Sequence, residues 1–366
     1  MVTTGSASVK SSTEVTLSGS FAEASDTPTE VGFYYGTSSG SKTYKKTVTA
    51  GSDGRFSADI TGLAAGTKYY WRPYVKVNGT GSYASQSKEV IGSESTFTTQ
   101  AAPSAGDVKP AQGKSWLELP GATTNSNYVV NTYYDGTSTD SNRNYTHLYD
   151  KSTYTSLWTA YHLNSSHMGS LSRPGSWSFS PSISTGDQVD LCSSSYSDSY
   201  SRGHMIPNAS RNGIKNMQLQ TFYVTNSVPQ IQDNFNGGIW SSLEGALQSI
   251  GKTEEIYIVT GVAFNKVGEA KTVKTTKAKD DNKTVPVPNY FYKVALKVEK
   301  SGSTVTSAKA IGFWFEHKTY SGSYTNYAVS VDQIEQWTGF DFFVNLPDTI
   351  ENNAESNSDW SAFQNF

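Results

Sequence analysis

The chain has 366 residues, a net charge of −3 and a single cysteine. This length allows two domains with hydrophobic cores of their own, and one thiol excludes an intrachain disulfide. No apolar run reaches the roughly eighteen residues that a membrane-spanning helix needs.

The composition is rich in Ser, Thr, Tyr, Asn and Gly and poor in charge, which favours an extracytoplasmic protein, either secreted or attached to a surface. The first residues lack the charged-then-apolar pattern of a signal peptide. The net charge argues mildly against a nucleic-acid binder, because phosphate contacts favour basic proteins. Residues 252–300 hold ten lysines against six acids. This run is either a basic patch or an ordinary solvated face, and the sequence leaves both readings open.

Residues 1–100 alternate short β-prone stretches with turn residues, which predicts an all-β sandwich. The stretches are EVTLSGSFAEA, EVGFYYGTS, TYKKTVTAG and RFSADI. The segment GLAAGTKYYWRPYVKVNGTG then resembles the later half of a fibronectin type III domain. Leu63, Tyr69, Trp71, Tyr74 and Val77 are expected to supply the packing. Such a module would serve as a spacer or an adhesive domain.

Residues 101–115 hold Pro and Gly and almost nothing apolar, which predicts a linker. Residues 116–366 mix strands with one amphipathic helix and show no βαβ rhythm, so we expect an α+β domain. The helix is predicted at about 236–250, where Trp240, Leu243 and Leu247 share one face and Gly251 ends it. The clearest predicted strands are 254–264, 289–299 and 309–317.

Three stretches in this domain carry groups suited to phosphodiester hydrolysis: SRGHMIP (201–207), FYVTNSVPQ (222–230) and NGGIWSSLE (236–244). The reaction needs a base for water, and histidine titrates near neutral pH. It also needs positive charge at the leaving oxygen, which a hard cation on oxygen ligands can supply. His204, Arg202, Asn236 and Glu244 offer a base, a phosphate contact and two oxygen ligands.

Residues 236, 240 and 244 are spaced by four, so on a helix they project toward one side. Gly237-Gly238 is costly inside a helix, by up to about 1 kcal/mol per Gly relative to Ala, which suggests close approach of a backbone or a ligand. A helix that began at Asn236 would favour an anion there rather than a cation, so the metal would depend on the side-chain oxygen and water.

The order of these stretches resembles the DNA/RNA non-specific endonuclease family of ββα-metal nucleases, which includes endonuclease G. That family reads D-R-G-H, then N-x-x-P-Q, then L-N-x-x-x-W-x-x-L-E. Further agreement comes from LYDKSTYTSLWTAYHLN, IVTGVAF, VPVPNYFYKVAL and SVDQIEQWTGFDFFVNLPD, so the resemblance spans about 230 residues in the right order.

The resemblance implies a Mg²⁺ cofactor, with Mn²⁺ as the alternative ion, and DNA and RNA as substrates, cut internally to leave 5′-phosphate ends. It implies that His204 is the general base and that Asn236 is the one direct protein ligand of the metal. Glu244 would orient metal-bound water or protonate the leaving oxygen, and Arg202 would touch the phosphate.

Two further residues follow from the resemblance. It implies that Asn226 sits beside His204 and holds either its orientation or the scissile region, and it places Arg173 at a second phosphate contact. Ser201 departs from the family pattern, which has Asp there; serine keeps a hydrogen-bond acceptor but loses a negative charge near the metal. That departure leaves a degenerate, non-cutting nucleic-acid binder as one alternative. The aromatic content and the fibronectin-like module leave a carbohydrate-binding or adhesive surface protein as another. The sequence does not fix the oligomeric state.

Overall fold

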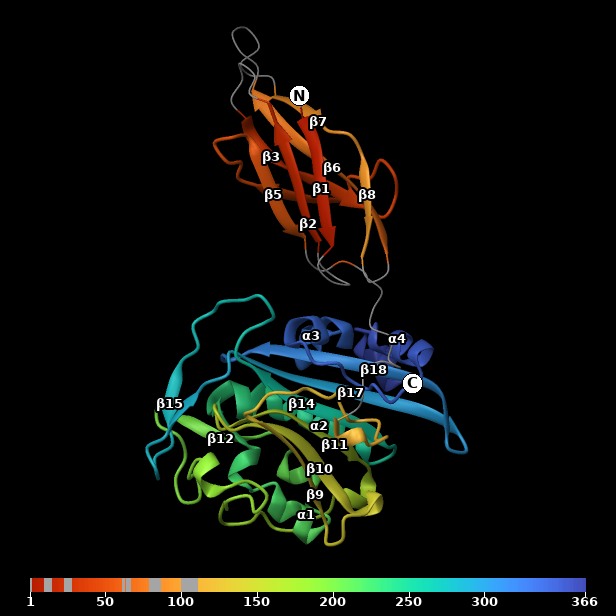
Figure 1. Ribbon diagram of the computed structural model, residues 1–366. Coiled ribbons are helices and arrows are strands. Elements are labelled where there is room, and N and C mark those ends of the chain that lie inside the picture. The colour runs from red at the N-terminus through yellow and green to blue at the C-terminus, as the bar shows by residue number, and fades with distance from the viewer. Residues whose placement is uncertain are drawn as a thin grey trace. The chain divides into compact units, whose positions relative to one another are not determined.

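The computed structural model describes residues 2–9, 15–22, 28–60, 63, 67–78, 87–99 and 111–366 (Figure 1). The chain divides into two compact units, Met1–Ser104 and Ala105–Phe366. None of the helices among the described residues is both long enough and apolar enough to cross a membrane.

The first unit is built from strands alone in its described part. One antiparallel sheet has the order β1 (Val2–Val9), β2 (Val15–Phe21), β5 (Arg55–Ile60). The other has the order β4 (Tyr44–Val48), β3 (Pro28–Gly36), β6 (Lys68–Asn78), β7 (Ser87–Ile91), and β8 (Ser95–Thr98) also pairs with β6. The predicted all-β organisation of this region is therefore confirmed.

Both sheets contribute to one core, in which Leu17 of β2 and Phe56 of β5 meet Phe33 of β3 and Trp71 of β6. Of the five residues predicted to pack this core, Tyr74 is on the wrong face. Side chains alternate along a strand, and Tyr74 differs in parity from Trp71. Its ring instead stacks on Tyr34 outside the core, with centroids 4.5 Å apart.

A seven-stranded antiparallel sheet organises the second unit. Its order is β19 (Ala328–Val329), β18 (Thr304–Glu316), β17 (Tyr290–Ser301), β14 (Ile256–Ala263), β11 (Thr155–Leu163), β10 (Arg143–Asp150), β9 (Tyr128–Tyr134). The three strands predicted from continuous apolar runs correspond to β14, β17 and β18. Helices are α1 (Lys215–Gln220), α2 (Ser241–Gly251), α3 (Val331–Thr338), α4 (Asp348–Glu355) and α5 (Trp360–Gln364). This mixture confirms the predicted α+β class.

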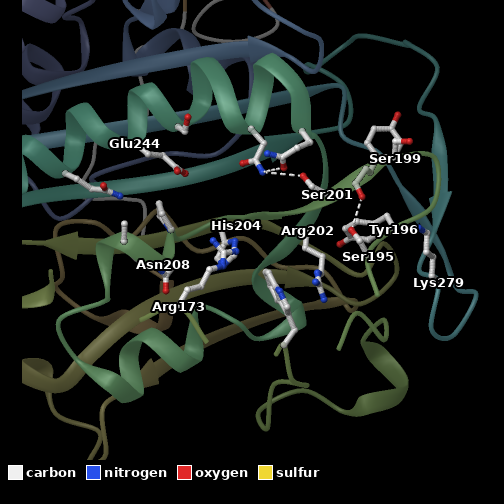
Figure 2. Close-up of a pocket in the computed structure, with 18 residues that line it drawn as sticks. Arg173, Ser195, Tyr196, Ser199, Ser201, Arg202, His204, Asn208, Glu244 and Lys279 are labelled. Carbon is white, nitrogen blue, oxygen red and sulfur yellow. Dashed lines mark hydrogen bonds between the residues drawn. The ribbon is translucent and has the colours of Figure 1, made fainter. Parts of the chain in front are cut away.

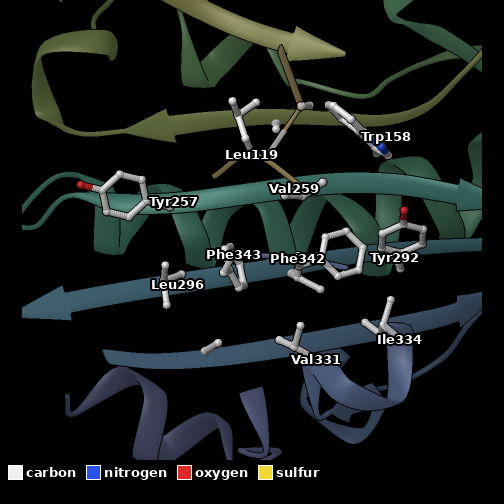
Figure 3. Packing of buried hydrophobic residues seen from close by; sticks show 14 of the residues in the cluster. Leu119, Trp158, Tyr257, Val259, Tyr292, Leu296, Val331, Ile334, Phe342 and Phe343 are labelled. Atoms are coloured by element: carbon white, nitrogen blue, oxygen red, sulfur yellow. The ribbon is translucent and has the colours of Figure 1, made fainter. Parts of the chain in front are cut away.

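Each face of this sheet packs against its own layer. On one face, Val259 and Tyr292 contribute to a core shared with Val331 and Ile334 of α3 (Figure 3) and with Ala354 of α4. On the other face, Ile258 and Phe291 pack with Leu243 and Leu247 of α2. The sheet therefore separates α2 from α3 and α4.

A long excursion between neighbouring central strands β11 and β14 carries the segment of interest. It contains β12 (Tyr200–His204), β13 (Ser227–Ile231), a π-helical segment η8 (Gln232–Trp240) and α2. A separate hairpin is formed by β15 (Thr275–Lys277) and β16 (Thr284–Pro286). Short 3-10 turns cover Ala111–Gly113, Asp140–Asn142, Ser165–His167, Thr185–Asp187, Asn208–Ser210, Val224–Asn226 and Tyr324–Tyr327.

The linker predicted at 101–115 lies mostly outside the described residues, which resume at 111. The described end of it belongs to the second unit. Ala111 is buried in that unit's core, and the Gln112 side chain donates a hydrogen bond to the carbonyl oxygen of Val130.

Candidate active site

Two strands and a helix form the framework of the candidate site. β12 pairs antiparallel with β13, so that Ser201 lies opposite Gln230 and His204 lies opposite Ser227. Gly203 is required in this pair, because a side chain there would collide with the buried side chain of Gln230. After β13 the chain passes through η8 into α2 and places a helix beside the strand pair.

The helix begins later than the sequence predicted. Regular α-helix starts at Ser241 rather than at Asn236, because Gly238 between them has non-helical backbone angles, φ −126° and ψ −111°. At Gly237 the close neighbour is a side chain: a Cβ there would lie 2.9 Å from the side-chain nitrogen of Gln232. Asn236 therefore does not lie at the N-terminus of a regular helix, and the expected conflict with the helix dipole is removed.

An open cleft of about 780 Å³ lies between this helix and the strand pair. Five of the predicted site residues line it: Arg173, Arg202, His204, Asn236 and Glu244. Figure 2 shows Glu244 on the helical side of the cleft, with His204, Arg202 and Ser201 on the strand side. The excursion between β11 and β14 thus brings these residues into one cavity.

His204 is held by aromatic neighbours. Its ring centroid lies 4.6 Å from that of Trp177 and 5.0 Å from that of Phe222. Burial, reinforced by Arg173 and Arg202, lowers the pKa of His204 to about 3, so the imidazole is neutral at neutral pH. Its Nε2 atom is buried and has no hydrogen-bond partner among the described residues. A neutral ring with an unused nitrogen can accept a proton.

The two arginines also stand on aromatic rings. The guanidinium carbon of Arg202 lies 5.3 Å from the ring centre of Trp177, and that of Arg173 lies 5.1 Å from the ring centre of Phe222. Arg202 also donates a 2.7 Å hydrogen bond from Nη1 to the carbonyl oxygen of Leu191. These contacts fix two cationic groups beside His204 while leaving donors for an anion.

Asn226 lies beside the end of the strand that carries His204. It is fully buried and does not line the cleft. Its Oδ1 accepts a hydrogen bond from the Ile206 backbone amide, and its Nδ2 donates to the carbonyl oxygens of Ile206 and Thr221. The two bonds to Ile206 hold the backbone that follows His204, and the third ties it to the turn at Thr221. The structure therefore shows Asn226 as a support for the strand end, without access to a bound molecule.

Asn236 presents an oxygen to the cleft. Its Nδ2 donates to Ser201 Oγ at 3.3 Å and to Gln232 Oε1 at 3.0 Å, while no described residue donates to its Oδ1. Ser201 Oγ in turn donates to the carbonyl oxygen of Gln230 at 2.9 Å. The amide is thereby oriented with its oxygen free. An uncharged oxygen donor of this kind suits a hard divalent cation that keeps most of its water.

Glu244 has a partner that the sequence did not reveal. Lys293 of β17 is fully buried, and its Nζ lies 3.5 Å from Glu244 Oε1. The ammonium also donates to Thr260 Oγ1 at 2.7 Å and lies 4.4 Å from the ring centre of Trp240. Burial raises the pKa of Glu244 and lowers that of Lys293 to about 8. The loss of hydration thus outweighs the attraction between the two charges.

The lysine run at 252–300 is not a single surface. Lys293 and Lys297 are buried, and Lys279 is the member of the run that lines the cleft. A signal for Lys293 was present in the sequence, because this lysine interrupts the otherwise apolar run from Tyr290 to Leu296. A charge inside a fully buried strand is rare unless it is paired.

A strand pair followed by a helix, with these groups around one open cleft, fits the nuclease class of hydrolases. Comparison with known proteins agrees: the family model described as DNA/RNA non-specific endonuclease matches residues 122–349. The chain belongs to the DNA/RNA non-specific endonuclease family.

Curated relatives are named as nucleases. A protein named Nuclease from Nostoc sp. is 31% identical over 219 residues, covering 58% of this chain and 75% of that protein. The mitochondrial nuclease EXOG of Mus musculus is 28% identical over 224 residues, covering 58% of each chain. Nuclease C1 of Cunninghamella echinulata is 32% identical over 155 residues, covering 40% of this chain and 58% of that protein. The chain thus spans little more than half the length of the last two.

Proposed function

We propose that the second unit is a Mg²⁺-dependent endonuclease that hydrolyses internal phosphodiester bonds of DNA and RNA without sequence specificity. The observation that carries this proposal is the cleft that gathers His204, Asn236, Glu244 and two arginines. The cleft offers positive charge and a base. A site that contacts the phosphate backbone rather than the base edges has little sequence specificity.

In this proposal His204 takes the proton from the attacking water through Nε2. Arg173 and Arg202 bind the phosphate on the same side of the cleft as His204. The negative charge of the bound phosphate compensates the positive charge of the two arginines. Since both arginines lower the pKa of His204, a bound phosphate raises that pKa again and makes the ring a stronger base.

The helical side of the cleft serves the leaving group. Asn236 holds Mg²⁺, or Mn²⁺ as the alternative ion, through its free Oδ1. When bound, the ion supplies positive charge beside the leaving oxygen. Glu244 orients water in this half of the cleft, and Lys293 favours the ionised form of its carboxylate. Asn226 acts as a positioning residue that fixes the backbone after His204.

For the first unit we propose a fibronectin type III-like module that acts as a spacer or adhesive domain. Its two sheets, with three strands in one and the β4-β3-β6-β7 order in the other, support this assignment. We also propose that the protein acts outside the cytoplasm, as its polar, charge-poor composition suggests.

The test is cleavage of plasmid DNA and structured RNA with Mg²⁺, with EDTA, and by Asn236→Ala. We expect wild type to cut both substrates only with the metal, and Asn236→Ala to need at least about tenfold more Mg²⁺. Asn216→Ala is the matched control, since this exposed asparagine bonds to Asp135 and lies outside the cleft. Inert wild type with Mg²⁺ and Mn²⁺ would instead support the degenerate nucleic-acid binder.

Ser201→Asp is expected to strengthen Mg²⁺ binding, so that less Mg²⁺ is needed for activity. A carboxylate there still accepts the Asn236 amide and adds a negative charge beside the cation. We expect the Mg²⁺ concentration for half-maximal activity to fall about three- to tenfold, or roughly 0.7–1.4 kcal/mol. A Mg²⁺ titration of activity measures it. Ser201→Asn, similar in size but uncharged, is the control, and an equal shift in both variants would contradict the electrostatic explanation.

A further inference from the structure

A cluster of carboxylates lies between α3 and α4, on the sheet face opposite the cleft. Asp332 and Glu335 are one turn apart on α3, and Glu351 and Glu355 are one turn apart on α4. One carboxylate oxygen from each of Asp332, Glu335 and Glu355 lies within 4.8 Å of the others. The face is defined by Ile334 and Ala354, which pack in the core that does not contain α2.

The cluster is not neutralised by the protein. The ion pairs found among the described residues of this unit involve none of the four acids. The charged groups that act most strongly on Glu335, Glu351 and Glu355 are other carboxylates. The arrangement is unfavourable for ionised groups without a compensating cation.

A second observation points to a missing partner at the same place. Glu355 is only 4% exposed and Glu351 only 5%, and the Oε1 atom of each is buried without any hydrogen-bond partner among the described residues. Glu335 is already oriented, because the backbone amide of Phe342 donates to its Oε1 at 2.7 Å. Buried polar atoms are almost always paired with protein, water or an ion.

We propose that α3 and α4 bind a Ca²⁺ ion between Asp332, Glu335 and Glu355, as a structural site separate from the cleft. Calcium takes oxygen ligands at about 2.3–2.6 Å, so two ligands of one ion lie up to about 5 Å apart. The three oxygens lie within 4.8 Å of one another, which is inside that limit. Magnesium fits less well, because its distances are about 2.0–2.1 Å and it retains several waters. Asp332 is exposed, which leaves a route for entry and room for water ligands.

The site is tested in full-length Asn236→Ala, which lacks the cleft ligand, by thermal unfolding followed by tryptophan fluorescence. All eight tryptophans except Trp71 lie after residue 104, so the signal reports mainly the second unit. At about a hundred times the dissociation constant, Ca²⁺ is expected to raise Tm by about 5–10 °C relative to EGTA. Calorimetric titration should give one ion per chain.

Two added substitutions decide the location. Glu355→Gln and Asp332→Asn should each reduce the Ca²⁺-induced shift to less than about 2 °C, and Asp332→Asn changes an exposed residue. Glu299→Gln, an exposed carboxylate on β17, should leave the shift unchanged. No shift with Ca²⁺, an undiminished shift in both variants, or an equal shift with Mg²⁺ at the same concentration would overturn the proposal.

Discussion

His204→Gln is expected to lower kcat for plasmid cleavage by about 10²–10⁴-fold, the usual contribution of a positioned general base. Glutamine keeps a polar side chain between Trp177 and Phe222 but cannot accept the proton from water at neutral pH. Substrate binding should persist, because Arg173 and Arg202 remain in place. Salt-dependent DNA binding and single-turnover cleavage, measured on the same preparation, separate the two quantities.

The matched control for that substitution is His167→Gln. His167 is also buried, but its Nδ1 accepts from the backbone amide of Asn164 and it does not line the cleft. This variant should lose stability and keep its kcat. If both glutamine variants lost activity equally, the loss would reflect general damage to the unit and His204 would not be the base.

Lys293→Met is expected to cost about 3–5 kcal/mol of unfolding free energy, because it leaves Glu244 in a largely buried position without its counter-charge. The same change removes the group that lowers the pKa of Glu244. That pKa then rises further, and the acid limb of the kcat/KM profile moves to higher pH by at least about one unit. Urea unfolding and pH-rate profiles measure the two effects.

Two comparisons separate the roles of this pair. The double variant Lys293→Met/Glu244→Gln should recover most of the lost stability without recovering activity, because a neutral pair no longer buries a lone charge. Lys297→Met is the control on the same strand and face. Its partner Glu254 is 46% exposed and stays hydrated when alone, so this variant should keep the wild-type pH profile. An unshifted acid limb in Lys293→Met would reduce Lys293 to a structural role.

The strands β14, β17 and β18 were predictable because each contains a continuous apolar run that is buried. The start of the helix was not. A four-residue spacing is compatible with a helix from Asn236, but Phe235 and Trp240 are both buried through non-helical backbone in η8. Hydrophobic spacing reports which side chains are buried, and it is insensitive to a local departure from helical dihedrals that keeps them buried.

Site residues were predictable where the chemistry depends on the residue's own side chain. They were not predictable where the role depends on a partner far away in the sequence. His204, Asn236 and Glu244 carry chemistry that can be read from the residue itself. The side-chain amide of Asn226 is fully hydrogen-bonded to the backbone of Ile206 and Thr221, and no spacing in the sequence indicates these bonds. Lys293 meets Glu244 only because β17 passes beneath α2, a pairing that depends on the assembled sheet.

The excursion between β11 and β14 has a consequence for how such a protein could be rebuilt. Arg173, Arg202, His204, Asn236 and Glu244 all fall between Leu163 and Ile256, which are paired with each other on neighbouring strands. The two ends of this segment are therefore paired with each other in the sheet, so that the segment can be treated as one insertion. Transplanted into another antiparallel sheet, it would carry the proposed base, the two arginines and the proposed metal ligand, but not Lys293. A host strand would have to provide a buried lysine at that register before the graft could work.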